Sequence, residues 1–155
     1  MACCRYRYFI MPLPILYLAG PLFNPSERAL NLNIRAALQP WFCVHLPQID
    51  GALLPNLIAM GVSPEDARRR IFREDMAAVR RSDALLIVLN GRSVDEGAAF
   101  ELGVAWCLGK PCFGYKDDFR QLLPDGDNPM ITGSLSSIFR SIDELSLWAA
   151  AYPNP

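Results

Sequence analysis

Short apolar runs alternate with longer amphipathic segments along the chain. Residues 84–89 form the clearest run, and others lie at 15–19, 41–46, 111–115 and 138–139. Runs that are almost uniformly apolar are typical of strands buried in a parallel sheet. Because helix-like segments separate them, the pattern predicts an α/β fold: a doubly wound sandwich with a mainly parallel five-stranded sheet.

Capping residues mark the ends of the predicted helices. Helices are expected over about 24–39, 63–82, 95–108 and 141–151. Asn24 or Ser26 is expected to cap the first of them, and Ser63 the second. Ser141 and Glu144 have the spacing of a capping box at the start of the last helix.

Two long segments lack a strong periodic pattern. Residues 47–62 are expected to be irregular or weakly helical, and residues 116–133 form a long polar loop. A loop as long as residues 47–62 in a small domain is often a lid over a site.

The N-terminal region contains an apolar stretch at residues 8–19. Pro12 and Pro14 interrupt it and no cleavage site follows, so it does not resemble a signal peptide, and it is too short to span a membrane. We expect residues 1–10 to be a disordered extension and residues 11–155 to form a single domain.

Composition narrows the function classes. The chain has 155 residues, 52% of them hydrophobic and 20% charged, which fits one globular domain with a real core. The net charge is −1 and no basic block is present, which argues against a nucleic-acid polymer as partner. Neither a G-x-G-x-x-G nor a Walker pattern occurs, which disfavours dinucleotide and ATP binding.

Cysteine and histidine usage argues against a metal site. The five cysteines lack metal-type spacing, and Cys43, Cys107 and Cys112 lie in apolar runs where they are expected to be small core residues. This usage indicates a reducing, cytoplasmic setting. His45 is the sole histidine, so a multi-histidine metal site is excluded, and its position at the end of a strand is more typical of a structural residue. We expect no metal and no cofactor.

Glu101 is the main candidate for chemistry. After Asp95, a suitable helix cap, and Glu96, it is the only charge in a helix that is apolar all round and that Gly109 can end. Such a helix is normally buried, and a buried carboxylate is costly unless it has a partner. Glu101 is therefore either a satisfied structural acid or a functional one.

Asp75 and Asp95 strengthen the functional interpretation. Asp75 falls on the apolar stripe of the helix before the 84–89 strand, where an acid is either a partnered core group or a site residue. In a doubly wound sheet the ligand crevice lies at the carboxyl ends of the strands, and the loops at 20–24 and 90–97 are expected there. Carboxylates that converge on one cleft take separate acid and nucleophile roles.

These residues resemble the nucleoside 2'-deoxyribosyltransferase family. The matching segments span most of residues 15–135 in the same order, and the most specific is the acidic helix motif at 95–103. The full set is 15–21 with Phe23-Asn24-Pro25, Glu74-Asp75 before 82–84, the motif at 95–103, Gly109-Lys110-Pro111, and Asn128-Pro129-Met130-Ile131. The resemblance implies a flavodoxin-like fold.

The resemblance also implies catalytic roles. Glu101 matches the nucleophile that attacks C1' of the deoxyribose, expels the base and forms a covalent glycosyl-enzyme. Asp75 matches the group that handles the proton of the leaving and incoming base. Tyr17 matches a tyrosine that orients the nucleophile, although it also fits a buried strand tyrosine.

Substrate-binding roles follow in the same way. Asp95 matches the acceptor for the sugar 5'-hydroxyl, and Gly20, Phe23 and Asn24 belong to a matching loop. Asn128, with Met130 close by, matches an asparagine that a neighbouring subunit delivers. The expected partners are thus a nucleoside, a nucleobase and further copies of the chain in a homo-oligomer, while a simple turn at 128–129 remains an alternative.

Two other functions stay open. The related 2'-deoxynucleoside 5'-monophosphate N-glycosidases carry a serine where Asp95 stands, and a carboxylate there would repel a phosphate dianion. A free nucleoside is therefore favoured, although Arg28, Arg92 and Arg120 keep the nucleotide alternative open. Transfer and hydrolysis differ only in whether a base or water attacks the intermediate. A non-catalytic nucleoside sensor is the third possibility.

Overall fold

The sheet has five parallel strands, and it confirms the predicted doubly wound, flavodoxin-like fold. The computed structural model describes residues 12–124 and 126–152, so the extension expected at residues 1–10 lies outside them. The strands are β1 (Ile15–Ala19), β2 (Cys43–His45), β3 (Ala84–Val88), β4 (Cys112–Tyr115) and β5 (Ser137–Phe139). Their order is β2-β1-β3-β4-β5, with the fully buried β3 in the centre.

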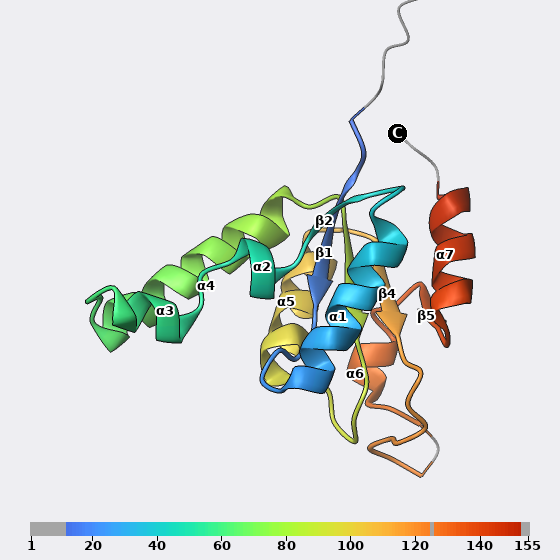
Figure 1. The fold of residues 1–155 in the computed structure, drawn as a ribbon. Helices are drawn as coiled ribbons and strands as arrows, with labels where there is room; N and C mark the ends of the chain where they lie inside the picture. Colours follow the sequence, from blue (N-terminus) through green and yellow to red (C-terminus); the bar gives the residue numbers. More distant parts are fainter. Residues whose placement is uncertain (1–11, 125, 153–155) are drawn as a thin grey trace, which may run out of the picture.

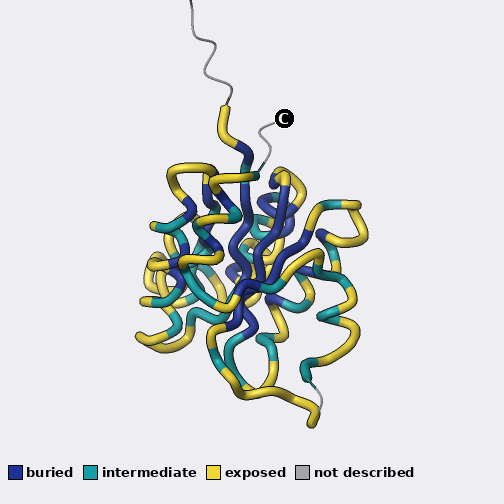
Figure 2. The backbone as a smooth tube through the Cα atoms, turned by 90° about the vertical axis from the view of Figure 1, so that its right-hand side faces the viewer, coloured by how far each residue is buried: buried dark blue, intermediate teal, exposed yellow. Residues whose placement is uncertain are grey.

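Two layers of helices cover the sheet (Figure 1). Helices α1 (Pro25–Leu38) and α7 (Ile142–Ala151) pack on one face, and α4 (Pro64–Arg81) and α5 (Glu96–Cys107) on the other. Each face therefore has its own hydrophobic cluster, and burial is concentrated along the strands (Figure 2). Apolar strands sandwiched in this way explain why the runs lack alternation.

The predicted caps form at the helix starts. Asn24 makes a complete capping box with Glu27 at the start of α1, and Ser63 accepts a hydrogen bond from the Asp66 amide at the start of α4. The Ser141 hydroxyl accepts from the Glu144 amide as predicted. The Glu144 carboxylate, however, accepts from the Arg140 amide, one residue before the cap, so the expected capping box is not completed by the Ser141 amide.

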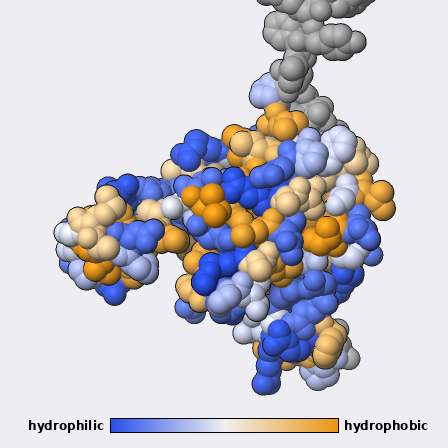
Figure 3. Space-filling model, viewed as in Figure 1, coloured by the Kyte–Doolittle hydropathy of each residue, from blue (hydrophilic) through white to orange (hydrophobic). Residues whose placement is uncertain are grey.

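The two long loops contain short helices. Residues 47–62 form α2 (Pro47–Asp50) and α3 (Leu54–Ala59), in line with the weak helical pattern, while α6 (Pro129–Thr132) interrupts the loop expected at 116–133. Helix α3 and the first half of α4 extend away from the sheet (Figure 1), and they form a separate lobe of the surface (Figure 3).

Two expectations about burial were wrong. Helix α5 is not buried all round, because Phe100, Trp106 and Cys107 are exposed on its outer side. Cys43 is exposed as well, and Cys112 alone of the three predicted core cysteines is buried. An apolar run identifies side chains that favour burial, but it does not show whether other parts of the same chain bury them.

No helix within the described residues is long and apolar enough to cross a membrane.

Candidate active site

The site lies where the strand order reverses, between β1 and β3. From here the chain leads outward to β2 on one side and to β4 and β5 on the other, so the loops after β1 and β3 separate and leave a crevice. Gly20 lies close to the end of β3, where a Cβ on this residue would lie only 3.0 Å from the Cβ of Val88. A glycine at this position therefore lets the β1–α1 loop pack directly on the end of β3.

Tyr17 and Glu101 form the centre of the site. Tyr17 lies on β1 and is completely buried, and its hydroxyl donates a hydrogen bond of 2.5 Å to Oε1 of Glu101 on α5. Burial and the neighbouring Glu101 carboxylate strongly raise the pKa of Tyr17, so the phenol keeps its proton and remains a donor. The bond holds Oε1, while Oε2 of Glu101 has no hydrogen-bond partner among the described residues.

Asp75 and Glu101 face the same cavity, between α4 and α5. The cavity has a volume of about 260 Å³, and its walls are mainly apolar. It is lined by Arg68, Ile71, Phe72, Asp75, Met76, Gly97, Phe100 and Glu101. The Phe72 and Phe100 rings lie 6.0 Å apart and are both about half exposed. Two carboxylates from different helices therefore share a cavity bordered by aromatic side chains.

Burial perturbs both carboxylates. The pKa of Glu101 is raised from 4.5 to about 7 in all: burial is the largest cause, the Tyr17 hydrogen bond lowers the pKa, and the charges of Asp75 and Asp95 raise it. Burial also raises the pKa of Asp75 from 3.8 to about 6, with a contribution from Glu74. Both acids therefore exchange protons near neutral pH, as groups that act in acid, base or nucleophile roles do.

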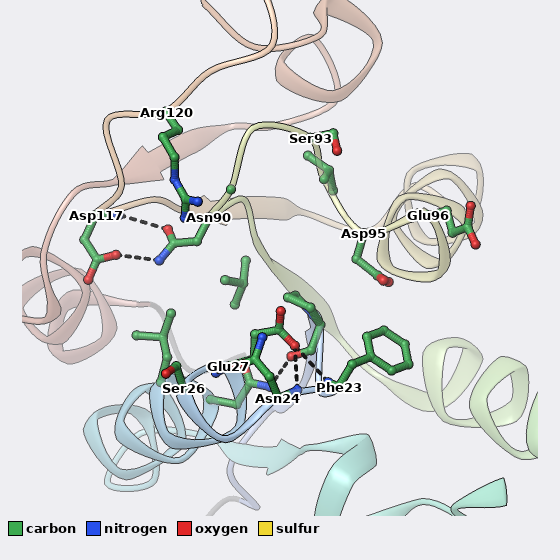
Figure 4. Close-up of a pocket in the computed structure, with 16 residues that line it drawn as sticks. Phe23, Asn24, Ser26, Glu27, Asn90, Ser93, Asp95, Glu96, Asp117 and Arg120 are labelled. Carbon is green, nitrogen blue, oxygen red and sulfur yellow. Dashed lines mark hydrogen bonds between the residues drawn. The ribbon is translucent and has the colours of Figure 1, made fainter.

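Asp95 lines a second and larger cavity. It caps α5 by accepting a hydrogen bond of 2.8 Å from the Ala98 amide. With Phe23 and Asn24 it lines a cavity of about 720 Å³ at the strand switch point. The residues that line this cavity come from α1 and from the loops after β1, β3 and β4 (Figure 4). The neighbouring residues Glu96 and Gly97 line one cavity each, so both cavities border the first turn of α5.

Negative charge predominates around the Asp95 cavity. Glu27, Asp95, Glu96 and Asp117 all line it, and Arg120 is the one cation among the lining residues. Arg120 already forms an ion pair with Asp118. The other arginines considered for a phosphate are elsewhere: Arg28 donates to the Leu22 carbonyl, and Arg92 lines a separate cavity. This cavity suits hydroxyl donors better than an anion.

Asn128 and Met130 are not brought to these cavities. Asn128 caps α6 by accepting from the Met130 amide, and it lines a third cavity of about 150 Å³ with Arg92 and Ser93. The Met130 side chain is 82% exposed. Within this chain neither residue lines the Glu101 cavity.

Several site residues were not singled out from the sequence. Phe72 and Phe100 border the Glu101 cavity, and the His45 ring stacks on Tyr17 with centroids 5.3 Å apart. Asn31 is buried in α1, where it donates to the Pro21 carbonyl and to Gln48. A polar residue at a buried helix position was the available signal for Asn31, and proximity to Glu101 in the motif was the signal for Phe100.

Residues 12–124 and 126–152 contain no group of three or more His, Cys, Asp and Glu side chains arranged to hold a metal ion.

The fold and the site define a class of protein: a doubly wound α/β domain in which two half-buried carboxylates share a cavity beside the central strands of the sheet. The sequence profile of the nucleoside 2-deoxyribosyltransferase family matches residues 16–144, and the chain belongs to this family. A comparison with curated protein sequences finds no match.

Solved structures share the fold. A 2-deoxyribosyltransferase from Bacillus psychrosaccharolyticus is 23% identical with a TM-score of 0.68, and the match covers 85% of this chain and 90% of that one. A conserved protein from Enterococcus faecalis is 23% identical with a TM-score of 0.66, covering 90% and 98%. The CMP N-glycosidase BcmB of Clostridium botulinum is 14% identical with a TM-score of 0.55, covering 90% and 99%.

Proposed function

We propose that the protein is a nucleoside 2'-deoxyribosyltransferase that works through a covalent deoxyribosyl-Glu101 intermediate. The observation that carries this proposal is that Glu101, held by the Tyr17 hydroxyl, lines the same cavity as Asp75. Family membership supports an enzyme that acts on nucleosides.

In the first half-reaction Glu101 is the nucleophile. Tyr17 holds Oε1, so Oε2 is the oxygen that attacks C1' of the deoxyribose. A C1'–O bond forms while the C1'–N bond to the base breaks, and the bonding electrons leave with the base. A buried carboxylate that stays unsolvated is a better nucleophile than an exposed one, provided that it has lost its proton.

Asp75 manages the proton of the base. A carboxyl whose pKa burial raises to about 6 holds a proton in part of the molecules at neutral pH, so it can protonate the departing base. In the second half-reaction Asp75 takes the proton of an incoming base as the base nitrogen attacks C1' and releases Glu101. If water attacks instead, the same site hydrolyses the nucleoside.

The substrate that fits best is a free nucleoside. Asp95 can accept a hydrogen bond from the 5'-hydroxyl of the sugar while it also caps α5. A 5'-phosphate in the same place would meet four carboxylates and one arginine that is already paired. The nucleotide N-glycosidase alternative is therefore disfavoured, although a relative of similar fold acts as a CMP N-glycosidase.

A neighbouring copy is proposed to complete the site. The outer side of α5 exposes Phe100, which lines the Glu101 cavity, and further along the helix Gly103, Trp106 and Cys107. Apolar surface of this kind usually marks an interface. Packing of a second copy there would cover the cavity and deliver its Asn128 and Met130, both of which are exposed in this chain.

The direct test is base exchange followed by intact-mass spectrometry. Deoxyinosine and adenine should yield deoxyadenosine, and a slow 2-fluoro analogue should leave an adduct with the mass of its fluorinated deoxyribosyl group on the wild-type chain but not on Glu101→Ala. Asp83→Ala is a matched control, since this acid binds the Ile15 amide outside the cavities that hold Glu101 and Asp95.

The outcomes separate the candidate functions. Base release without exchange would identify a hydrolase, and turnover of a deoxynucleoside 5'-monophosphate but not of the nucleoside would identify the nucleotide N-glycosidase. Ligand binding that raises Tm without any chemistry would identify a sensor.

A further inference from the structure

Lys116 is a buried charge that the proposed reaction does not use. It directly follows β4, its amide donates to the Phe139 carbonyl of β5, and its side chain is only 2% exposed. The ammonium group contacts both oxygens of Asp127, at 2.6 and 2.7 Å, and the Asp127 side chain is only 11% exposed. Burying such a pair costs more than burying apolar side chains of similar volume, so it is a poor way to obtain stability alone.

The pair closes the loop that leads to Asn128. Lys116 stands where the loop leaves β4, and Asp127 stands where it returns, one residue before Asn128 begins α6. At its start the loop is fixed separately, since Asp117 exchanges hydrogen bonds with Asn90 and Asp118 accepts from the Gly91 amide. The Lys116–Asp127 pair is therefore the polar contact that sets where the far end of the loop lies.

The position of Asn128 depends on this contact. Its side-chain oxygen is used to cap α6, while its amide nitrogen donates no hydrogen bond among the described residues. Asp127 and Asn128 are consecutive in the chain and line the same small cavity, so a shift of the Asp127 backbone also moves Asn128.

We propose that Lys116 and Asp127 are positioning residues, which hold Asn128 at the height and angle that the active site of a neighbouring copy requires. This inference rests on the proposed function, and in particular on delivery of Asn128 between subunits. Lys116 touches neither substrate nor reacting atoms; it acts through Asp127 and the adjoining backbone.

The test mixes subunits with different defects. The double variant Lys116→Met/Asp127→Leu replaces the ion pair with apolar side chains, an exchange that often preserves folding. Alone it should unfold near the wild-type Tm but lose about 10- to 100-fold in kcat/KM, because its sites receive a misplaced Asn128. Glu101→Ala alone should be inactive.

Subunit exchange between these two proteins should restore activity. In a mixed pair, the site that contains Glu101 of the double variant receives Asn128 from the Glu101→Ala copy, so it has all its parts. For paired subunits, random mixing should recover about a quarter of the wild-type activity per site. A mixture of Asn128→Ala with Glu101→Ala provides the reference, and it should recover to the same extent.

Each result has one meaning. If the reference mixture recovers but the double-variant mixture does not, the ion pair supports its own site and the positioning role is overturned. The same holds if the reference mixture fails, or if both the double variant and Asp127→Asn fail to fold. An inactive wild-type chain would instead contradict the proposed function, before any variant is compared.

Discussion

The proposed role of Glu101 as a nucleophile requires its ionised side chain, whereas burial makes the ionised form unfavourable for folding. Burial raises the pKa of this acid from 4.5 to about 7, so the folded protein binds the proton more tightly than the unfolded chain does. Well below pH 4.5 the group is protonated in both states and has no effect on the free energy of unfolding. As pH rises toward 7 the unfolded chain ionises first, and stability falls by up to about 3 kcal/mol.

Glu101→Gln should therefore stabilise the protein in a pH-dependent manner. Its Tm should match that of the wild type near pH 4.5 and exceed it near pH 8, because glutamine carries no charge that needs desolvation. Thermal unfolding of both proteins across this range measures the difference. A difference that is constant with pH would contradict the assignment of a raised pKa to Glu101.

Tyr17→Phe should change the pH dependence of the reaction as well as its rate. The lost hydrogen bond normally lowers the pKa of Glu101, so the pKa should rise and the acidic limb of the pH–rate profile should move to higher pH. The rate should fall about 10- to 100-fold, the worth of a hydrogen bond to a charged group. Tyr115→Phe removes a similar bond, to Asp117, and should leave the profile unchanged.

The sequence predicts some of these residues and not others. Glu101 and Asp75 stand out because a charge on an apolar helix face is visible from spacing alone. Phe100 and Lys116 do not, since an aromatic residue in an apolar helix and a lysine after a strand are ordinary in any sequence. Their importance comes from contacts across the fold, with Phe72 and with Asp127.

Asp95, the N-cap of helix α5, combines a structural role with a proposed role in binding the sugar. Asp95 caps the helix through the Ala98 amide, and it also lines the large cavity where the sugar is proposed to bind. The sequence predicted the cap and the ends of the helix from local signals. It was wrong about burial of the outer side, because local periodicity contains no information about which surfaces meet.

Two substitutions of Asp95 should separate the two roles. Asp95→Asn keeps a capping oxygen, so Tm should change little while KM for a nucleoside rises at least several-fold. Asp95→Ala loses the cap as well and should cost about 1 kcal/mol of stability in addition. Ser63→Ala, which removes the cap of α4, should show the stability loss with KM unchanged. Equal KM values for both Asp95 variants and the wild type would remove the sugar-binding role.

On the scale of the whole molecule, the sequence pattern predicted the topology of the sheet, but it did not predict which apolar side chains would stay exposed on the surface. Five apolar runs separated by capped helices allow few arrangements other than a doubly wound sheet, and the strand order agrees with it. The pattern of runs and caps does not predict that Phe100 and Trp106 on α5 are exposed. The sequence shows that Phe100 and Trp106 are apolar, whereas the structure is needed to show that no other part of the described chain covers them.

Gly103→Glu should test whether a second copy provides that cover. Gly103 lies on the exposed side of α5, and no atom lies within 4 Å of a Cβ built there, so the isolated chain accommodates the new side chain. Because glutamate favours helix more than glycine does, by about 1 kcal/mol, the chain itself should not be destabilised. A charged side chain would nevertheless block close packing of a neighbour on α5.

Light scattering after size-exclusion chromatography should then show an oligomer for the wild type and a monomer for Gly103→Glu. Base exchange should fall together with the mass, because separated copies no longer supply Asn128 to each other. Ala36→Glu adds the same charge on the exposed side of α1, across the sheet, and should alter neither mass nor activity. A monomeric Gly103→Glu with full activity would show that each chain completes its own site, and delivery of Asn128 between copies would have to be abandoned.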